Sequence, residues 1–122
     1  MLGVIVLAHG SRDPQWFGAI EAVAQAVAAR APQSPVRCAY LELCGPSLPE
    51  AAAELVAAGA TTLRVLPLFF GLGKHARQDL PRLAEALQQA HPSVRFEWLP
   101  TPTEQPRLLA LLAELAVAES KP

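Results

Sequence analysis

The chain alternates extended apolar segments with alanine-rich segments typical of helices, and this alternation repeats four times. The first apolar segment, residues 2–9, is almost continuously apolar, as in strands that are buried on both faces of a parallel sheet. Four β–α units with short connections predict an α/β fold, in which a doubly wound parallel sheet carries helices on both faces. The predicted strands span residues 2–9, 35–43, 61–70 and 94–100.

Residues with strong preferences for helix ends indicate where the helices between these strands begin and end. Asp13 is a suitable N-cap with Pro14 in the first turn, and Gly59 is suited to the C-terminal end of the second helix. Asp79 is the predicted cap of the third helix, and Pro67 predicts a bulge or the end of the third strand. The first, third and fourth helices are expected over residues 14–31, 79–90 and 104–118, and the whole chain, 1–122, as one domain.

The simplest doubly wound order for four such strands is 2-1-3-4. In this order the first and third strands are neighbours, and the direction of winding reverses between them. Ligands of open α/β sheets bind at this reversal, outside the carboxyl ends of the strands. His9 lies at the carboxyl end of the first strand, and His75 lies in the predicted loop after the third. The topology therefore predicts that both imidazoles reach the same crevice.

Other polar residues are expected at the same edge of the sheet. Imidazole and carboxylate groups suit Fe(II), Co(II), Ni(II) or Zn(II), and they are the usual general bases near neutral pH. Arginine and lysine side chains bind carboxylates or phosphates. Each residue also has a structural alternative: a strand-end histidine can bond a loop, Asp79 can cap a helix or orient His75, and exposed cations are commonly only solvated. The residues concerned are Ser11, Arg12, Glu42, Gly73, Lys74, Arg77 and Asp79.

The overall composition argues against several classes of function. The net charge of −1 gives no basic field for nucleic acid, and no apolar run reaches the 18–20 residues needed to span a bilayer. The N-terminus lacks signal-peptide features, so a cytoplasmic location is expected. Neither GxGxxG nor GxxxxGK[ST] occurs, so no motif supports nucleotide binding. Cys38 and Cys44 have neither redox nor zinc spacing, and we expect no disulfide.

The segments "LAHGSRDP", "YLELCGPSLPEA" and "GLGKHARQDLP" resemble those of the CbiX-type class II tetrapyrrole chelatases. The resemblance is to the short, single-domain form of the sirohydrochlorin chelatases, and it covers about residues 2–103. It implies the chelatase-like fold and insertion of a divalent metal into sirohydrochlorin, on the way to cobalamin with cobalt or siroheme with iron. Archaeal relatives insert nickel. Short members of the family work as homodimers.

Carried over residue by residue, the resemblance assigns roles to particular positions. The first-strand histidine of the family falls on His9, its Gly-x-His motif on Gly73 to His75, and its acidic residue on Glu42. These assignments imply His9 and His75 as metal ligands, and His9, His75 and Glu42 as the catalytic set. They also imply no organic cofactor, because the metal is a substrate. The residues expected to bind the carboxylate-rich ring are Ser11, Arg12, Gly73, Lys74 and Arg77.

Two other functions and one assembly remain open from the sequence. The same crevice could serve a non-catalytic metal or tetrapyrrole carrier, or a small phosphatase with His9 as nucleophile and Arg12 as phosphate clamp. A tetrapyrrole is wide compared with the edge of a four-stranded sheet, so a homodimer is expected to supply a second wall. The apolar positions that could form its contact are Leu68, Phe69, Phe70 and Leu72, although burial in the core is the more common fate of such residues.

Overall fold

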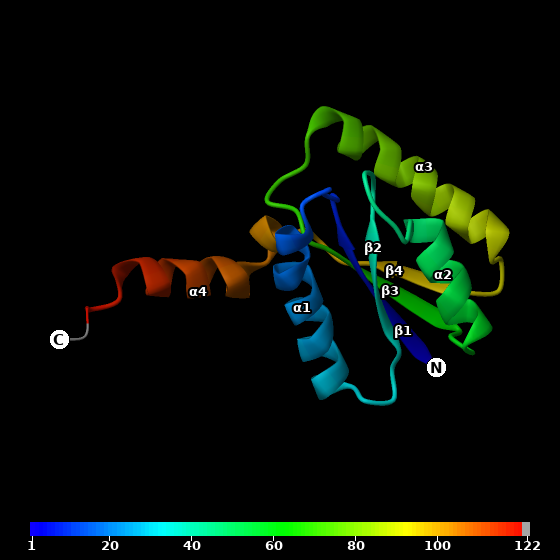
Figure 1. The fold of residues 1–122 in the computed structure, drawn as a ribbon, viewed down its shortest axis with the longest axis horizontal. Coiled ribbons are helices and arrows are strands. Elements are labelled where there is room, and N and C mark those ends of the chain that lie inside the picture. Colours follow the sequence, from blue (N-terminus) through cyan, green and yellow to red (C-terminus); the bar gives the residue numbers. More distant parts are fainter. Residues whose placement is uncertain (121–122) are drawn as a thin grey trace.

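The computed structural model describes residues 1–120 as a parallel four-stranded sheet with helices around it (Figure 1). Its strands pair in the order β2-β1-β3-β4, which confirms the order predicted from the sequence. Each strand is shorter than predicted, and β3 ends at Pro67, where proline was expected to end the ladder. The strands are β1 (Leu2–Ala8), β2 (Val36–Tyr40), β3 (Thr62–Pro67) and β4 (Arg95–Trp98).

Helices cover both faces of the sheet. One face of β1 presents Ile5 and Leu7 to a core that contains Leu48 and Leu55 of α2 and Leu87 of α3. Burying each such leucine or isoleucine side chain contributes about 1.5–3 kcal/mol to folding. The helical elements are η1 (Pro14–Trp16), α1 (Phe17–Arg30), α2 (Leu48–Ala57), α3 (Lys74–Ala90), η2 (Pro102–Glu104) and α4 (Pro106–Val117).

An aromatic cluster fixes α1 on the other face of the sheet. The ring of Tyr40 on β2 lies 5.8 Å from that of Trp16 and 5.3 Å from that of Phe17. Burial of Tyr40, with further contributions from Cys38, raises the pKa of its hydroxyl group to about 12. Burial likewise raises the pKa of the Cys38 thiol. Cys38 and Cys44 are both free thiols, which confirms the prediction of no disulfide.

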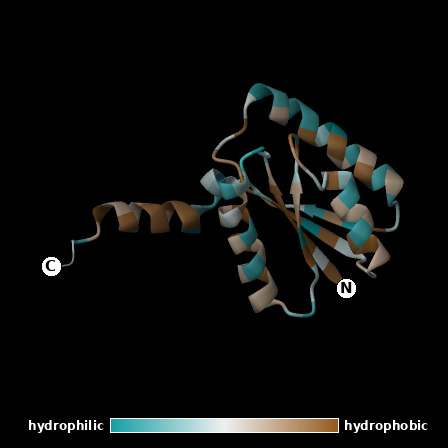
Figure 2. Ribbon diagram, viewed as in Figure 1, coloured by the Kyte–Doolittle hydropathy of each residue, from teal (hydrophilic) through white to brown (hydrophobic). Residues whose placement is uncertain are grey.

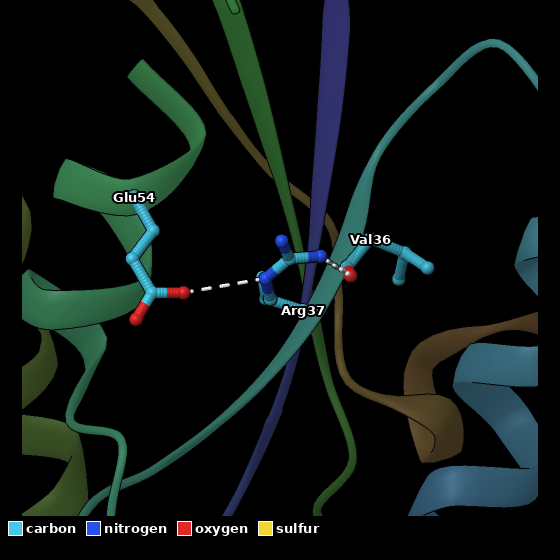
Figure 3. A network of polar contacts seen from close by, with 3 residues as sticks. All are labelled: Val36, Arg37 and Glu54. Carbon is cyan, nitrogen blue, oxygen red and sulfur yellow. Dashed lines mark hydrogen bonds and ion pairs between the residues drawn. The ribbon is translucent and has the colours of Figure 1, made fainter. Parts of the chain in front are cut away.

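Local capping and one ion pair position α2. Ser47 and Glu50 form a reciprocal capping box at its N-terminus, and Gly59 follows its C-terminal end with φ +106°. Figure 3 shows Arg37 on β2 donating from Nε to Glu54 of α2 at 3.2 Å, and from Nη1 to its neighbour's carbonyl at 2.9 Å. Because this pair is solvent-exposed, it contributes at most about 1 kcal/mol.

Helix α3 differs most from the sequence prediction, because it begins at Lys74 rather than near Asp79. Gly73 is its N-cap, and the Arg77 N–H donates to the Gly73 carbonyl at 3.0 Å. Asp79 is therefore not a cap. Pro81 lies inside the helix, where it lacks the N–H that would bond the Arg77 carbonyl. The two nearby glycines and Pro81 made residues 71–78 look like a loop, but the helical turn forms before the proline.

The first and last helices also begin later than predicted, because a short 3-10 turn precedes each of them. Asp13 does act as a cap, since its side chain accepts from the Gln15 N–H, but it caps the short 3-10 turn η1, and α1 begins only at Phe17. Near the C-terminus, η2 occupies the start of the predicted helix, and α4 begins at Pro106. Helix α4 projects away from the sheet in Figure 1.

Candidate functional site

The carboxyl ends of β1 and β2 are joined by backbone hydrogen bonds that bring His9 and Glu42 together. The N–H groups of Leu41 and Glu42 both donate to the His9 carbonyl oxygen at 3.1 Å. As a result, His9 Nε2 lies 3.6 Å from Glu42 Oε1. Both side chains are 59% exposed, so the pair stands at an open rim rather than in the core.

Gly10 makes this close approach possible. Its φ is +117°, and a Cβ at this position would lie 1.8 Å from the Glu42 carbonyl oxygen. Any other residue would have to displace the backbone beside Glu42. The sequence analysis did not single out Gly10. The signal was nevertheless present, because a glycine directly after a strand and a polar residue is typical of a close backbone approach.

His75 enters the site from the first turn of α3. With Asp79 and Leu83 it lies on one face of the helix, because residues four apart are stacked on successive turns. These three residues line a cavity of about 430 Å³ that His9 and Glu42 also line. The two imidazoles therefore share one cavity, as the topology predicted. Leu41, Ala76 and Leu80 complete its lining.

Phe69 supports the His9 ring from below. It is only 7% exposed, and its ring meets that of His9 edge-on, with centroids 5.9 Å apart and planes at 84°. From the sequence, Phe69 could form a dimer contact or be buried in the core, and the structure shows that it is buried in the core. Its neighbour Phe70 is instead exposed, with 74% of its surface accessible to solvent.

The predicted ring-binding residues are not gathered in the cavity. Arg77 lines a separate apolar cavity of about 310 Å³ beside Trp98, because two positions along a helix differ by about 200°. The Ser11 hydroxyl accepts from the Asp13 N–H at 3.0 Å, so it shapes the turn before η1. Gly73 contributes as the N-cap of α3. Arg12 and Lys74 are exposed, outside the residues that line the cavity.

Across residues 1–120, no group of three or more histidine, cysteine, aspartate or glutamate side chains is arranged to hold a metal ion. None of the described helices is long and apolar enough to cross a membrane.

Sequence comparison finds relatives whose names point to one chemistry. A sirohydrochlorin cobaltochelatase from Saccharolobus solfataricus is 40% identical over 83 residues, which are 68% of this chain and 63% of the relative. A sirohydrochlorin cobaltochelatase from Methanopyrus kandleri is 30% identical over 83 residues, covering 68% of this chain and 58% of the relative. The matched segment thus spans less than two thirds of these curated relatives.

Solved structures share the fold over more of the chain. A putative cobalamin biosynthesis CbiX protein from Marinobacter aquaeolei superposes with a TM-score of 0.80 at 29% identity, covering 95% of this chain and 94% of that one. SirB from Bacillus subtilis, solved with Fe³⁺, gives 0.71 at 25% identity, covering 83% of this chain and 40% of SirB. The CbiX family model matches residues 3–119. The chain described here therefore belongs to the CbiX family.

Proposed function

We propose that this chain is a sirohydrochlorin metal chelatase that inserts Co(II), Fe(II) or Ni(II) into the ring. The observation that carries the proposal is the convergence of His9 and His75 on one cavity, with Glu42 3.6 Å from His9. The relatives named above as sirohydrochlorin cobaltochelatases support this choice of substrate. The proposal treats residues 1–122 as one catalytic domain and the cytoplasm as its location.

In this proposal the two imidazoles bind the incoming metal and release it to the ring. Glu42 faces one nitrogen of His9, which leaves the other ring nitrogen to accept a metal ion. In this proposal the carboxylate orients the imidazole.

Insertion also requires the removal of two pyrrole protons. His9, His75 and Glu42 are the proposed acceptors, and Asp79 in the same cavity is positioned to serve beside His75. The apolar part of the cavity, which includes Leu80 and Leu83, suits the flat face of a tetrapyrrole.

The carboxylates at the rim of the ring need positive charge outside the cavity. We propose that the exposed side chains of Arg12 and Lys74 provide it, with Ser11, Gly73 and Arg77 in supporting positions. The wide ring needs a second wall, and a homodimer would supply it.

The proposal is tested by following the sirohydrochlorin absorption spectrum with Co(II) or Fe(II) in excess and protein at a tenth of the ring concentration. Wild type should convert all of the ring, whereas a carrier would stop at one ring per site. His9→Ala and His75→Ala should each slow conversion by at least about 100-fold. His91→Ala is the matched control, because His91 lies at the opposite end of α3. Full turnover by the His9→Ala, His75→Ala double variant would contradict the proposal.

A further inference from the structure

A second cavity, of about 310 Å³, lies beside the carboxyl ends of β3 and β4, where Pro67 and Trp98 end these strands. It is separate from the cavity of His9 and His75, and Leu80 of α3 contributes to the wall of both. Ligands of open α/β sheets bind outside the carboxyl ends of the strands, and small-molecule sites commonly measure about 300–1,000 Å³. The position and size of the second cavity are therefore those of a binding site.

The wall of this second cavity is mostly apolar and contains several flat, rigid groups. The indole ring of Trp98 forms part of it, together with the pyrrolidine rings of Pro67, Pro81 and Pro100. Indole rings stack favourably on other aromatic rings, and mostly apolar pockets bind ligands with a large apolar body. The wall thus favours a flat, apolar group in the cavity.

Arg77 is the cation in this wall. Its side chain is exposed, so it stands where the cavity opens to solvent. Among residues 1–120 its guanidinium forms no ion pair, whereas those of Arg37 and Arg64 are paired with glutamates. A guanidinium binds a carboxylate through two parallel hydrogen bonds, and an apolar surround strengthens them because water competes less. Arg77 therefore favours a negatively charged group at the mouth of the cavity.

The other polar residues of the wall are already bonded to each other. The Thr101 N–H donates to Glu104 Oε2 at 3.1 Å, as part of the capping box of η2. No ion pair links Glu104 to Arg77 within the part of the chain that the structure describes. Glu104 thus serves the start of η2, and Arg77 is left to select the charge of a ligand.

Helix α4 leaves this cavity open. The helix begins at Pro106, two residues after Glu104, but none of its residues lines the cavity. Figure 2 shows α4 as an apolar arm that extends beyond the sheet, in the same place as α4 in Figure 1. A ligand can therefore enter the cavity from solvent.

We propose that this cavity binds a carboxylate carried on a flat apolar body, with the carboxylate paired to Arg77 and the flat face against Trp98. Two sources share this chemistry. One is a free aromatic acid, which would make the cavity a site of its own. The other is a carboxylate arm of a tetrapyrrole that extends past Leu80, and this source alone rests on the proposed function. A phosphate fits less well, because a single guanidinium satisfies few of its oxygens.

Trp98 provides a direct signal for the first test. The chain has two tryptophans, so Trp16→Phe leaves Trp98 as the only one. In this variant, 3-phenylpropanoate should change the tryptophan emission until one molecule is bound per chain. The amide 3-phenylpropanamide has the same shape without the charge, and it should bind at least about tenfold more weakly. An absent or unsaturable response, or equal affinities for the acid and the amide, would overturn the proposal.

Substitutions in α3 test the two halves of the site separately, again in the Trp16→Phe background. Arg77→Gln should weaken the acid at least about tenfold and leave the affinity of the amide unchanged. Arg82→Gln is the matched control, because Arg82 is an exposed arginine of α3 that lines neither cavity, and it should change neither affinity. Equal losses for both probes in Arg77→Gln, or none, would contradict the pairing.

Filling the cavity tests the apolar half. Ala84 lines the cavity, so Ala84→Leu should weaken the acid and the amide alike, by at least about tenfold. Ala86→Leu is its control, because Ala86 is exposed on the same helix outside the cavity, and both affinities should stay at their Trp16→Phe values. Unchanged binding in a folded Ala84→Leu variant would place the probe elsewhere. Arg77→Gln, which alters an exposed side chain, keeps the proposal testable if Ala84→Leu does not fold.

Competition calorimetry with wild type distinguishes the two sources. Displacement of 3-phenylpropanoate by excess metal-free sirohydrochlorin would assign the cavity to a carboxylate arm of the ring, and unchanged affinity would assign it to a free acid. Displacement by an equal concentration of inorganic phosphate would overturn the choice of carboxylate. None of these measurements uses metal insertion, so the site can fail while the proposed function stands, or stand while that function fails.

Discussion

Gly10, which has no side chain, allows the close backbone approach that brings His9 and Glu42 together. The backbone after β1 passes so close to Glu42 that no Cβ fits, and this contact sets the separation between His9 and Glu42. Both histidines and Glu42 could be predicted from the sequence because polar residues at strand ends are visible in a pattern. The contribution of Gly10, and that of Phe69 beneath His9, depends on distances that no pattern records.

Gly10→Ala should destabilise the fold by at least about 2 kcal/mol and disturb the Glu42 loop, since it adds both a clash and an unfavourable positive φ. Urea unfolding measures the change. Gly18→Ala is the matched control: Gly18 is helical, with no atom within 4 Å of an added Cβ, so alanine should instead stabilise by about 0.5 kcal/mol. Equal stabilities for the two variants would contradict the close approach.

Glu42→Gln tests the negative charge beside His9 separately from the shape of the Glu42 side chain. The amide keeps the size of the side chain but loses the negative charge that supports the imidazole, so metal insertion should slow about 10–100-fold. The spectral assay measures this loss. Glu54→Gln is the control, because Glu54 is also an exposed, paired carboxylate but lies away from the cavity, and its rate should be that of wild type.

At the scale of elements, α3 determines which residues reach the site. Its early start at Lys74 gives the third helix two faces, one that carries His75 and Asp79 to the cavity and one that carries Arg77 away from it. A loop over residues 71–78, as predicted from the sequence, would allow all of these side chains to turn inward. A helix does not, and only its true starting point reveals which residues share a face.

Helix α2 offers a test of local capping. Ser47→Ala removes the hydroxyl that accepts from the Glu50 N–H, and it should cost about 1 kcal/mol of stability. Thermal or urea unfolding measures it. A loss below about 0.2 kcal/mol would show that the cap contributes little to the folded state.

The same capping box should make part of the stability depend on pH. The hydrogen bond from the Ser47 backbone lowers the pKa of Glu50 below its ordinary value of 4.5. A group with a lowered folded-state pKa stabilises the fold above its unfolded value, and this contribution is lost as the pH falls through the folded one. The melting temperature of wild type should therefore exceed that of Glu50→Gln at neutral pH, and the gap should close in acid. A gap that widens in acid would contradict this sign.

At the scale of the whole molecule, the sequence predicts the sheet better than what surrounds it. Strand order follows from the short connections between β–α units and from the continuous burial of β1, which are general rules. The position of α4 follows from no such rule. Its leucines read as core residues, and only the structure shows that the chain directs them away from its own sheet.

The proposed homodimer and the proposed chemistry together predict how specific chelatase activity depends on protein concentration. If the second copy supplies a wall for the ring, specific chelatase activity should fall on dilution in step with the fraction of dimer measured by sedimentation. Constant specific activity through dissociation would show that one subunit handles the ring alone.

The central claim is that His9 and His75 hold one metal ion between them, and it is tested most directly by imidazole NMR during Co(II) titration. The account predicts that the signals of His9 and His75 shift or broaden together and are complete at one ion per chain, while those of His91, at the far end of α3, are unchanged. A response of only one of the two, or responses completed at different stoichiometries, would contradict the shared site.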